Sequence, residues 1–313
     1  RIVANVAGDV APLFLPEYQE FFGNRVALDI AARQGTEFGV AVERLSLETR
    51  GLQLNGTARL TAAFLPESVD LTGRIGTDIG LPVVLPLAGP PLLVHGADLA
   101  LTYDAAAGDT FTLDVAAEGI QRTDGLLIDR LSLLADGQLG VEDATRVTGA
   151  EADIAADLSG FSHTDHALFE AVGDDLTLAA GVDWTQGGAL RLAGLDVAAG
   201  ETVSAQGAAT VTGLERGEIA VDAALDAALG DLSRFAAIAG QPIAGAIDAA
   251  LRADYAVNSG AFDVTLEGQS RDLRVGTPAA DGLLAGVVDL DVAAARDVDG
   301  IAIDRLRLDG ARI

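Results

Sequence analysis

The residues best suited to chemistry in this chain lie in the segment SHTDH at 162–166. It places His163, Asp165 and His166 close together, and the whole chain has only three histidines. Imidazole and carboxylate groups are ligands for zinc and related metals, but a metal site also needs a third or fourth ligand. No further ligand is evident in the sequence. We therefore interpret the segment as the solvated start of a helix, and we expect no metal site and no cofactor.

Two pairs of neighbouring acids are the next candidates. Asp174–Asp175 and Glu142–Asp143 offer adjacent carboxylates, whereas glycoside hydrolysis needs two carboxylates that converge across a cleft. Both pairs fall in predicted turns, where charged side chains are normally solvated. The chain has no cysteine, and the nucleophile-elbow, P-loop and dinucleotide-binding motifs are absent. The sequence therefore predicts that the protein has no catalytic residues and is not an enzyme. Trp184 could be a ligand platform, but it continues an apolar strand face, which favours core packing.

The composition limits the class of protein. Half of the 313 residues are hydrophobic and the mean hydropathy is +0.33, yet the formal net charge is −27. Such a chain must sort aliphatic side chains onto one surface and acids onto another. The acidic balance excludes a nucleic-acid-binding protein, because a polyanion would be repelled. The sequence contains no methionine, and we expect it to be an internal segment of a longer protein.

A period of two residues dominates the hydrophobic pattern and predicts half-buried β-strands. In LQLNGTARL (52–60), for example, leucine, glycine and alanine alternate with polar residues. Short helices are predicted at 16–23, 164–173 and 231–240, with Thr164 as a possible N-cap. A helical period also fits 221–235, where we favour a strand followed by a short helix. The remaining predicted strands are 26–31, 69–75, 111–115, 150–158, 176–184, 203–213, 219–225, 246–255, 262–268 and 287–293.

These strands predict an all-β fold. About fifteen strands of about five to ten residues, stacked about 4.8 Å apart, make a ribbon on the order of 70 Å long. A sheet of that size normally curls or splits. We predict an elongated, curled β-sheet, a taco- or solenoid-like groove with a few short helices, continuous over 1–313. The run GLPVVLPLAGPPLLV (80–94) is too short and too rich in proline for a membrane-spanning helix, and we expect an extended connection.

One phrase occurs three times: GVAVERLSL (39–47), GLLIDRLSL (125–133) and GIAIDRLRL (300–308). The two apolar pairs of each copy have opposite alternation phases, and the phase changes at the acid–arginine pair. We predict that a β-bulge at this pair returns all four apolar side chains to one side. LRLAGLDV (190–197) is a less regular relative. The segments 87–119 and 238–268 also resemble each other, which predicts an irregular array of repeats.

The apolar face predicted in this way contains many small residues, such as Gly56, Ala58, Ala180, Ala205 and Gly207. A tightly packed core would favour larger, interdigitating side chains. A trough lined by alanine, valine and leucine suits acyl chains, because each buried CH₂ gains about 0.8 kcal/mol. The face therefore predicts either an open acyl-chain groove or, if its walls meet, a closed core.

The chain resembles the translocation and assembly module family TamB, within the AsmA-like group of bridge-like envelope proteins. APLFLPEYQEFFGNRVAL (11–28), VDLTGRIGT (69–77), LSRFAAIAGQPIAGAIDAAL (232–251) and the repeated phrases show the resemblance. It implies a periplasmic groove segment of a protein anchored in the inner membrane of a Gram-negative bacterium. The implied role is phospholipid transport to the outer membrane and assembly of outer-membrane proteins. A barrel partner would bind other parts of the full chain, since this segment shows no recognisable N-terminal anchor or C-terminal end.

The resemblance and the alternation together assign the residues that line the groove and contact phospholipid acyl chains. They are Val40, Val42, Leu45, Leu47, Leu52, Leu54, Leu126, Ile128, Leu131, Leu133, Leu176, Leu178, Val182, Ile247, Leu251, Ile301, Ile303, Leu306 and Leu308.

Three other classes of protein remain open. A structural β-solenoid or adhesin would have the same strands around a closed core and would bind no lipid. A β-helix enzyme acting on polysaccharide would show an acid cluster on one external face. An outer-membrane barrel needs aromatic girdles, and aromatic residues make up only 4% of this chain.

Overall fold

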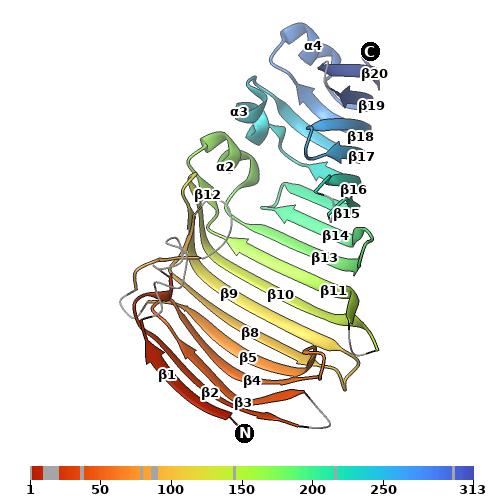
Figure 1. Ribbon diagram of the computed structural model, residues 1–313. Helices are drawn as coiled ribbons and strands as arrows, with labels where there is room; N and C mark the ends of the chain where they lie inside the picture. The colour runs from red at the N-terminus through yellow and green to blue at the C-terminus, as the bar shows by residue number, and fades with distance from the viewer. Residues whose placement is uncertain are drawn as a thin grey trace. The chain divides into compact units, whose positions relative to one another are not determined.

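The computed structural model describes residues 2–9, 21–35, 39–77, 80–85, 91–143, 146–214, 217–297 and 300–313. The fold is all-β, as predicted, with 67% strand and 8% helix. The chain divides into two compact units, Arg1–Thr164 and Asp165–Ile313, which are red to yellow-green and green to blue in Figure 1. One continuous architecture over 1–313 stays a prediction, and each unit is described by itself.

Unit 1 is a single antiparallel layer in which neighbours along the chain are mostly neighbours in the sheet. Its long strands follow one another in the order β1, β2, β3, β4, β5, β8, β9, β10, β11. The short strands β6, β7 and β12 pair near one end of this layer, against each other, β9 and β10. The strands are β1 (Ile2–Gly8), β2 (Val26–Gln34), β3 (Val40–Glu48), β4 (Leu52–Leu60), β5 (Pro66–Gly76), β6 (Val83–Val84), β7 (Leu92–Val94), β8 (Gly96–Asp104), β9 (Thr110–Arg122), β10 (Leu126–Glu142), β11 (Arg146–Ser159) and β12 (Ser162–His163).

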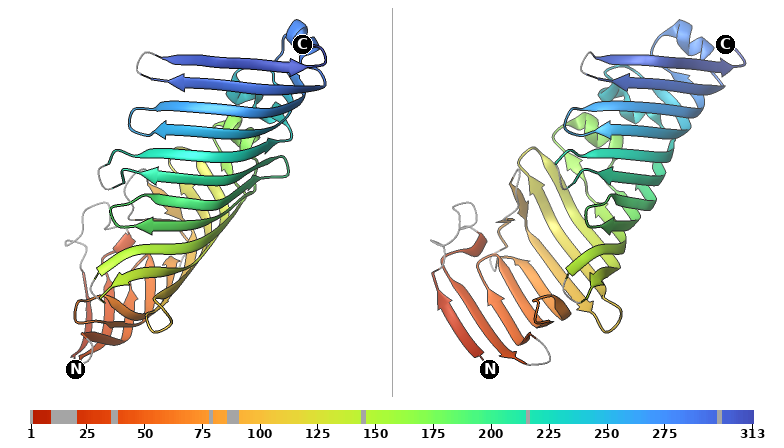
Figure 2. Two further views of the ribbon diagram at one scale, coloured as in Figure 1. Left: turned by 90° about the vertical axis from the view of Figure 1, so that its right-hand side faces the viewer. Right: turned by 45° about the vertical axis from the view of Figure 1, so that its right-hand side comes forward.

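Unit 2 is an antiparallel meander from β13 to β20 in which each strand pairs with the next. The helices all connect to the same ends of the strands, which we call the helix end (Figures 1 and 2). The opposite ends, joined by turns, form the hairpin end. The elements are α2 (His166–Val172), β13 (Leu176–Thr185), β14 (Leu190–Ala199), β15 (Val203–Thr212), β16 (Ala220–Leu229), η2 (Leu232–Phe235), α3 (Ala236–Ala239), β17 (Ala244–Ala256), β18 (Ala261–Arg274), α4 (Pro278–Leu283), β19 (Val287–Arg296) and β20 (Ile301–Gly310).

The short helices begin where polar side chains cap them. The Asp231 carboxylate accepts the backbone N–H of Ser233 at the start of η2, so the strand-then-helix prediction for 221–235 is confirmed. The prediction of Thr164 as the N-cap of α2 is wrong. Asp165 caps that helix by accepting the Ala167 N–H. The predicted helix at 16–23 lies mostly outside the described residues, of which Phe21 and Phe22 are helical.

The strand count and lengths differ from the prediction. Within the described residues, twenty strands form instead of about fifteen. Three of them, β6, β7 and β12, have only two or three residues, too few to show an alternation. β10 has 17 residues and β11 has 14, beyond the predicted limit of ten. The described part of 80–94 is extended, as expected.

The first and third copies of the repeated phrase contain the predicted bulge. In β3 the pairing with β2 passes from Ala31↔Arg44 to Ala32↔Val42, so one extra residue stands in β3. The same shift occurs in β20 between Arg305 and Ile303. The arginine of each phrase also pairs with an acid on the preceding strand, Arg44 with Asp29 at 2.8 Å and Arg305 with Asp291 at 2.6 Å. The arginine therefore fixes the bulge from the polar face.

The second copy has no register shift, and a bulge relative to its neighbours is the wrong description. β10 keeps one register with β9 and one with β11 and β12 throughout this region. The phase nevertheless changes, because Asp129 and Arg130 are both exposed while Ile128 is buried and Leu131 is half-buried. The neighbouring strands are irregular at the same level, where Gly119 and Gly160 have φ of +62° and +66°. The phase change in β10 therefore lies between two glycines of positive φ on the neighbouring strands, and the register stays constant.

The related segment at 190–197 is a bulged strand like β3. The pairing of β14 with β15 shifts between Leu192↔Ala209 and Leu195↔Gly207, as that of β3 with β4 shifts between Val42↔Ala58 and Leu45↔Gly56. A Cβ on Gly56 would lie 2.0 Å from the Asp70 carbonyl oxygen, and one on Gly207 would lie 2.0 Å from that of Ala224. The residue that faces each bulge is thus a glycine whose backbone lies too close to the next strand for a side chain.

The predicted relation between 87–119 and 238–268 extends to individual pairs of residues. Tyr103 of β8 stands opposite Phe111 of β9 in unit 1. Tyr255 of β17 stands opposite Phe262 of β18 in unit 2. The two hairpins therefore present a tyrosine–phenylalanine pair at corresponding positions.

Candidate functional site: the apolar faces of the two sheets

Unit 1 presents one continuous apolar face, formed by side chains that stand opposite one another across the strands. Two rows show its composition. The central row is Ile30, Leu45, Gly56, Leu71, Leu101, Leu113, Ala135 and Ile154. The adjacent row is Leu28, Leu47, Leu54, Gly73, Leu99, Val115, Leu133 and Ala156.

Unit 2 has an apolar face of the same kind. Its central row is Leu195, Gly207, Leu225, Leu251, Leu266, Val292 and Leu306. In the row on the helix-end side, alanine and glycine make up four of the eight positions: Leu178, Val197, Ala205, Ala227, Ala249, Gly268, Leu290 and Leu308.

Most side chains on these faces are only half-buried. Among the predicted groove residues whose side chains are described, Ile128 alone is buried. Ile303 and Leu306 are 67% and 61% exposed, and both lie on β20, which pairs only with β19 among the described strands. The side chain of Ile301 lies outside the described part of the structure. A face packed against a second layer would bury its leucines as fully as a core does, so these faces are incompletely covered. The half-buried residues are Val40, Val42, Leu45, Leu47, Leu52, Leu54, Leu126, Leu131, Leu133, Leu176, Leu178, Val182, Ile247, Leu251 and Leu308.

Each face is closed at one end by a small core. In unit 1, Val94, Ile120 and Ile128 are buried together near β6, β7 and β12. In unit 2, Leu284 packs with Val288 and Leu290 at the helix end, where Val288 is 1% exposed. The closed end of unit 1 lies opposite the β8–β9 turn, which we also call its hairpin end, and the closed end of unit 2 lies opposite the hairpin end of that unit.

The hairpin ends differ between the two units. In unit 1 the buried Tyr103 hydroxyl donates to Asp109 Oδ1 at 2.6 Å, and burial together with this carboxylate raises the pKa of Tyr103. In unit 2 the corresponding Tyr255 is 42% exposed. Arg296 stands beside Phe262 there, where unit 1 has Gly137 beside Phe111. Unit 2 thus ends in an exposed tyrosine, a half-buried phenylalanine and an exposed arginine.

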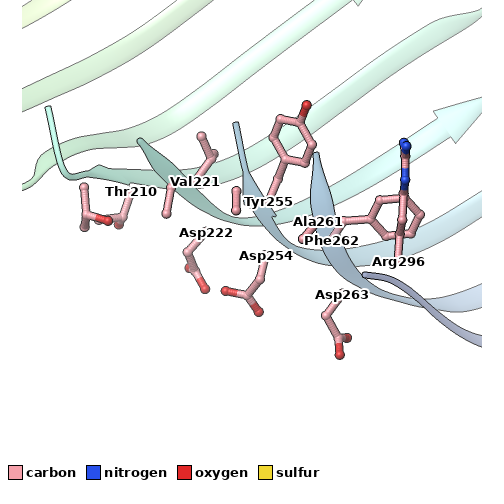
Figure 3. A pocket seen from close by; sticks show the side chains of 12 residues that line it. Thr210, Val221, Asp222, Asp254, Tyr255, Ala261, Phe262, Asp263 and Arg296 are labelled. Atoms are coloured by element: carbon pink, nitrogen blue, oxygen red, sulfur yellow. The ribbon is translucent and has the colours of Figure 1, made fainter. Parts of the chain in front are cut away.

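The opposite face of unit 2 is polar and acidic. Asp222, Asp254 and Asp263 stand directly opposite one another on three neighbouring strands. They line a hollow of 350 Å³ at the strand ends, which Tyr255, Phe262 and Arg296 also line. Figure 3 shows these carboxylates on one side of the strands and the Tyr255, Phe262 and Arg296 side chains on the other. A hydrogen bond with Asp222, then burial and repulsion from Asp222 and Asp263, raise the pKa of Asp254.

The residues that sequence reasoning weighed for chemistry do not form a site of their own. Asp165 caps α2, and the His166 ring stacks on Phe169 with centroids 6.2 Å apart. In the part of the chain that the structure describes, no group of three or more histidines, cysteines or acids could hold a metal ion. Trp184 is half-buried opposite Leu190 on the apolar face.

Comparison of the chain with protein-family models, with curated proteins and with solved structures found no match. Within the described residues, no helix has both the length and the apolar character needed to cross a bilayer.

Arg296 is the functional candidate that sequence reasoning missed. The signal was available, because Val288, Leu290, Val292 and Ala294 precede it in the same alternation phase. Continuing that phase by one step places Arg296 on the apolar face, at the point where the strand ends.

Proposed function

We propose that this chain binds the acyl chains of phospholipids along its apolar faces. The observation that supports the proposal is the incomplete burial of a continuous aliphatic surface in both units. An exposed apolar surface of this extent is unfavourable in water and normally marks an interaction site. The faces offer apolar contact without fixed polar anchors in their central rows, so a bound chain could move along them.

The resemblance to the TamB family extends this proposal to transport. We propose that the chain is a groove segment of an envelope protein that carries phospholipid between the inner and outer membranes of a Gram-negative cell. The acidic polar faces suit an element that crosses an aqueous space, because like charge keeps it solvated and away from anionic membrane surfaces. Assembly of outer-membrane proteins with a barrel partner is part of the same proposal and would involve other parts of the full chain.

A closed structural solenoid is the alternative. It would require the leucines of the central rows to be covered, and their partial exposure counts against it. A polysaccharide-cleaving enzyme would need an external acid cluster with a substrate cleft, and the aspartate row of unit 2 offers only the open hollow already described.

Lipid that co-purifies with the protein provides the test. The chain would be secreted into a bacterial periplasm, purified, and extracted for quantification of phospholipid by mass spectrometry. Leu71→Asp adds a charge to the apolar face of β5, and Thr72→Asp adds the same charge to the polar face one residue later. We expect several-fold less phospholipid with Leu71→Asp and no change with Thr72→Asp.

Equal phospholipid in both variants, or none in the unmodified protein, would contradict the proposal. Circular dichroism would verify that both variants are folded, and Leu71→Ser replaces Leu71→Asp if the charged variant is not.

A further inference from the structure

We infer that Arg296, at the hairpin end of the apolar face of unit 2, binds the phosphate of a phospholipid headgroup. This inference rests on the proposed function and adds an orientation to it. The acyl chains would extend from Arg296 toward the helix end, and the headgroup would remain at the exposed end of the face.

The first argument is the position of this cation. Arg296 stands opposite Phe262 and on the same face of β19 as Val292 and Ala294. It is therefore the last residue on the apolar face of that strand. In the described part of unit 2, Arg191, Arg252, Arg271 and Arg307 belong to the alternation phase of the polar face, and Arg305 lies at a bulge. An arginine exposes its guanidinium while its methylene stem packs on apolar surface, which suits the boundary between acyl chains and a headgroup.

The second argument is that Arg296 has no ion-pair partner among the residues that the structure describes. The arginines of the bulges pair with acids, as Arg44 does with Asp29 and Arg305 with Asp291. Among the described residues, no carboxylate forms an ion pair with Arg296, although acids outnumber bases 47 to 20 in the chain. The guanidinium is thus available to an external anion, and its planar donors match a phosphate.

The third argument comes from the corresponding hairpin of unit 1. There Gly137 occupies the position of Arg296, and the Tyr103 hydroxyl is bound to Asp109. In unit 2 the Tyr255 ring is 42% exposed, and no described group accepts or donates a hydrogen bond at its hydroxyl. Figure 3 shows Tyr255, Phe262 and Arg296 on the same side of the strands. Unit 2 therefore offers one cation and one hydroxyl where unit 1 offers neither.

The dimensions of the face fit a lipid. From Arg296 to Val288 at the closed helix end, the strand covers four alternation steps, or about 27 Å. The acyl chains of one membrane leaflet span about 15 Å, half of a hydrocarbon core. A headgroup at Arg296 would therefore leave its chains on the aliphatic rows, short of the small core around Val288.

The charge of the protein selects the kind of lipid. A chain with a net charge of −27 repels an anionic lipid, whereas a zwitterionic lipid presents a phosphate to Arg296 without net charge. We therefore identify the occupant as a zwitterionic glycerophospholipid such as a phosphatidylethanolamine.

Photo-crosslinking on the apolar face tests the inference. A photoreactive residue would replace Val292, on the same strand face as Arg296. Crosslink yield would be titrated with two probes in neutral detergent micelles: dioleoyl phosphatidylethanolamine, and dioleoylglycerol, which has the same chains but no phosphate. Arg296→Gln removes the proposed phosphate ligand, and Arg252→Gln removes an exposed arginine from the polar face of β17 as the matched control.

We expect Arg296→Gln to weaken phosphatidylethanolamine binding about tenfold, the loss of one strong charge-assisted interaction, and to leave dioleoylglycerol binding unchanged. Arg252→Gln should change neither. Three results would overturn the role of Arg296: Arg296→Gln weakens the binding of both lipids equally, both variants weaken phosphatidylethanolamine binding equally, or neither variant weakens it. In each case the bound lipid would still support the proposed function. If the otherwise unmodified protein crosslinks neither lipid, the proposed function fails as well.

Discussion

Two leucines on the apolar face of unit 2 provide a quantitative test of whether that face is open. Leu290 is 8% exposed in the core at the helix end, whereas Leu306 on the neighbouring strand is 61% exposed. Full burial of a leucine side chain stabilises a fold by about 2 kcal/mol, so the two fifths that Leu306 buries contribute about 0.8 kcal/mol. Replacing Leu306 by alanine should therefore lower the free energy of unfolding by less than about 1 kcal/mol.

Leu290→Ala removes a buried side chain and leaves a cavity, which costs about 2–5 kcal/mol. Urea unfolding followed by circular dichroism would measure both variants on the same 313-residue chain. A cost for Leu306→Ala as large as that for Leu290→Ala would refute the reasoning. It would mean that Leu306, on the edge strand β20, is covered in solution.

Three further predictions concern the ends and bends of the sheets. Tyr103→Phe loses the hydrogen bond to Asp109 and should cost about 1.5–3 kcal/mol in urea unfolding, whereas Tyr255→Phe should cost little; equal costs would contradict the difference between the two hairpins. Gly207→Ala places a Cβ against the Ala224 carbonyl and should cost about 1–3 kcal/mol, while Gly282→Ala, which meets no atom within 4 Å, should be harmless in the same assay. The pKa of Asp254 is raised, mainly by its hydrogen bond with Asp222. The Asp254 carboxyl therefore takes up its proton at a higher pH in the folded protein than in the unfolded chain. The two carboxylates repel each other only at pH values above the raised pKa, where both are ionised. Asp254→Asn should therefore raise the melting temperature at neutral pH but not at a pH where both carboxyls are protonated. Asp226→Asn is the control, because Asp226 stands opposite Ala250 on β17. A gain in melting temperature that persists in acid would show that the repulsion is not the cause.

The strands could be predicted from the sequence because a half-exposed sheet imposes a strict alternation of apolar and polar residues. β4, from Leu52 to Leu60, shows this alternation without interruption. The bulges of β3 and β20 could also be predicted, since an extra residue reverses the phase within one strand. The second copy of the phrase misled this reasoning. Whether a phase change appears as a bulge depends on the neighbouring strands, and Gly119 and Gly160 become neighbours of Asp129 only in the folded sheet.

The site was predictable only in part. Alternation assigns the residues of the apolar face, but their exposure depends on whether another layer covers them, which a strand pattern does not encode. The closed helix end depends on Leu284 of the α4 region packing on Val288 and Leu290, a contact set by the return of the chain after β18. Arg296 could have been assigned by extending the phase of β19 to its last residue.

Lipid photo-crosslinking in a bacterial envelope tests the central proposal most directly. A photoreactive residue would replace Leu54, which is half-buried on the apolar face of β4, with the exposed Gln53 on the opposite face as its control. The proposal predicts crosslinks to phospholipid at position 54 and none at position 53. A folded protein that crosslinks no lipid at either position would contradict it, and the closed structural solenoid would then be the better description.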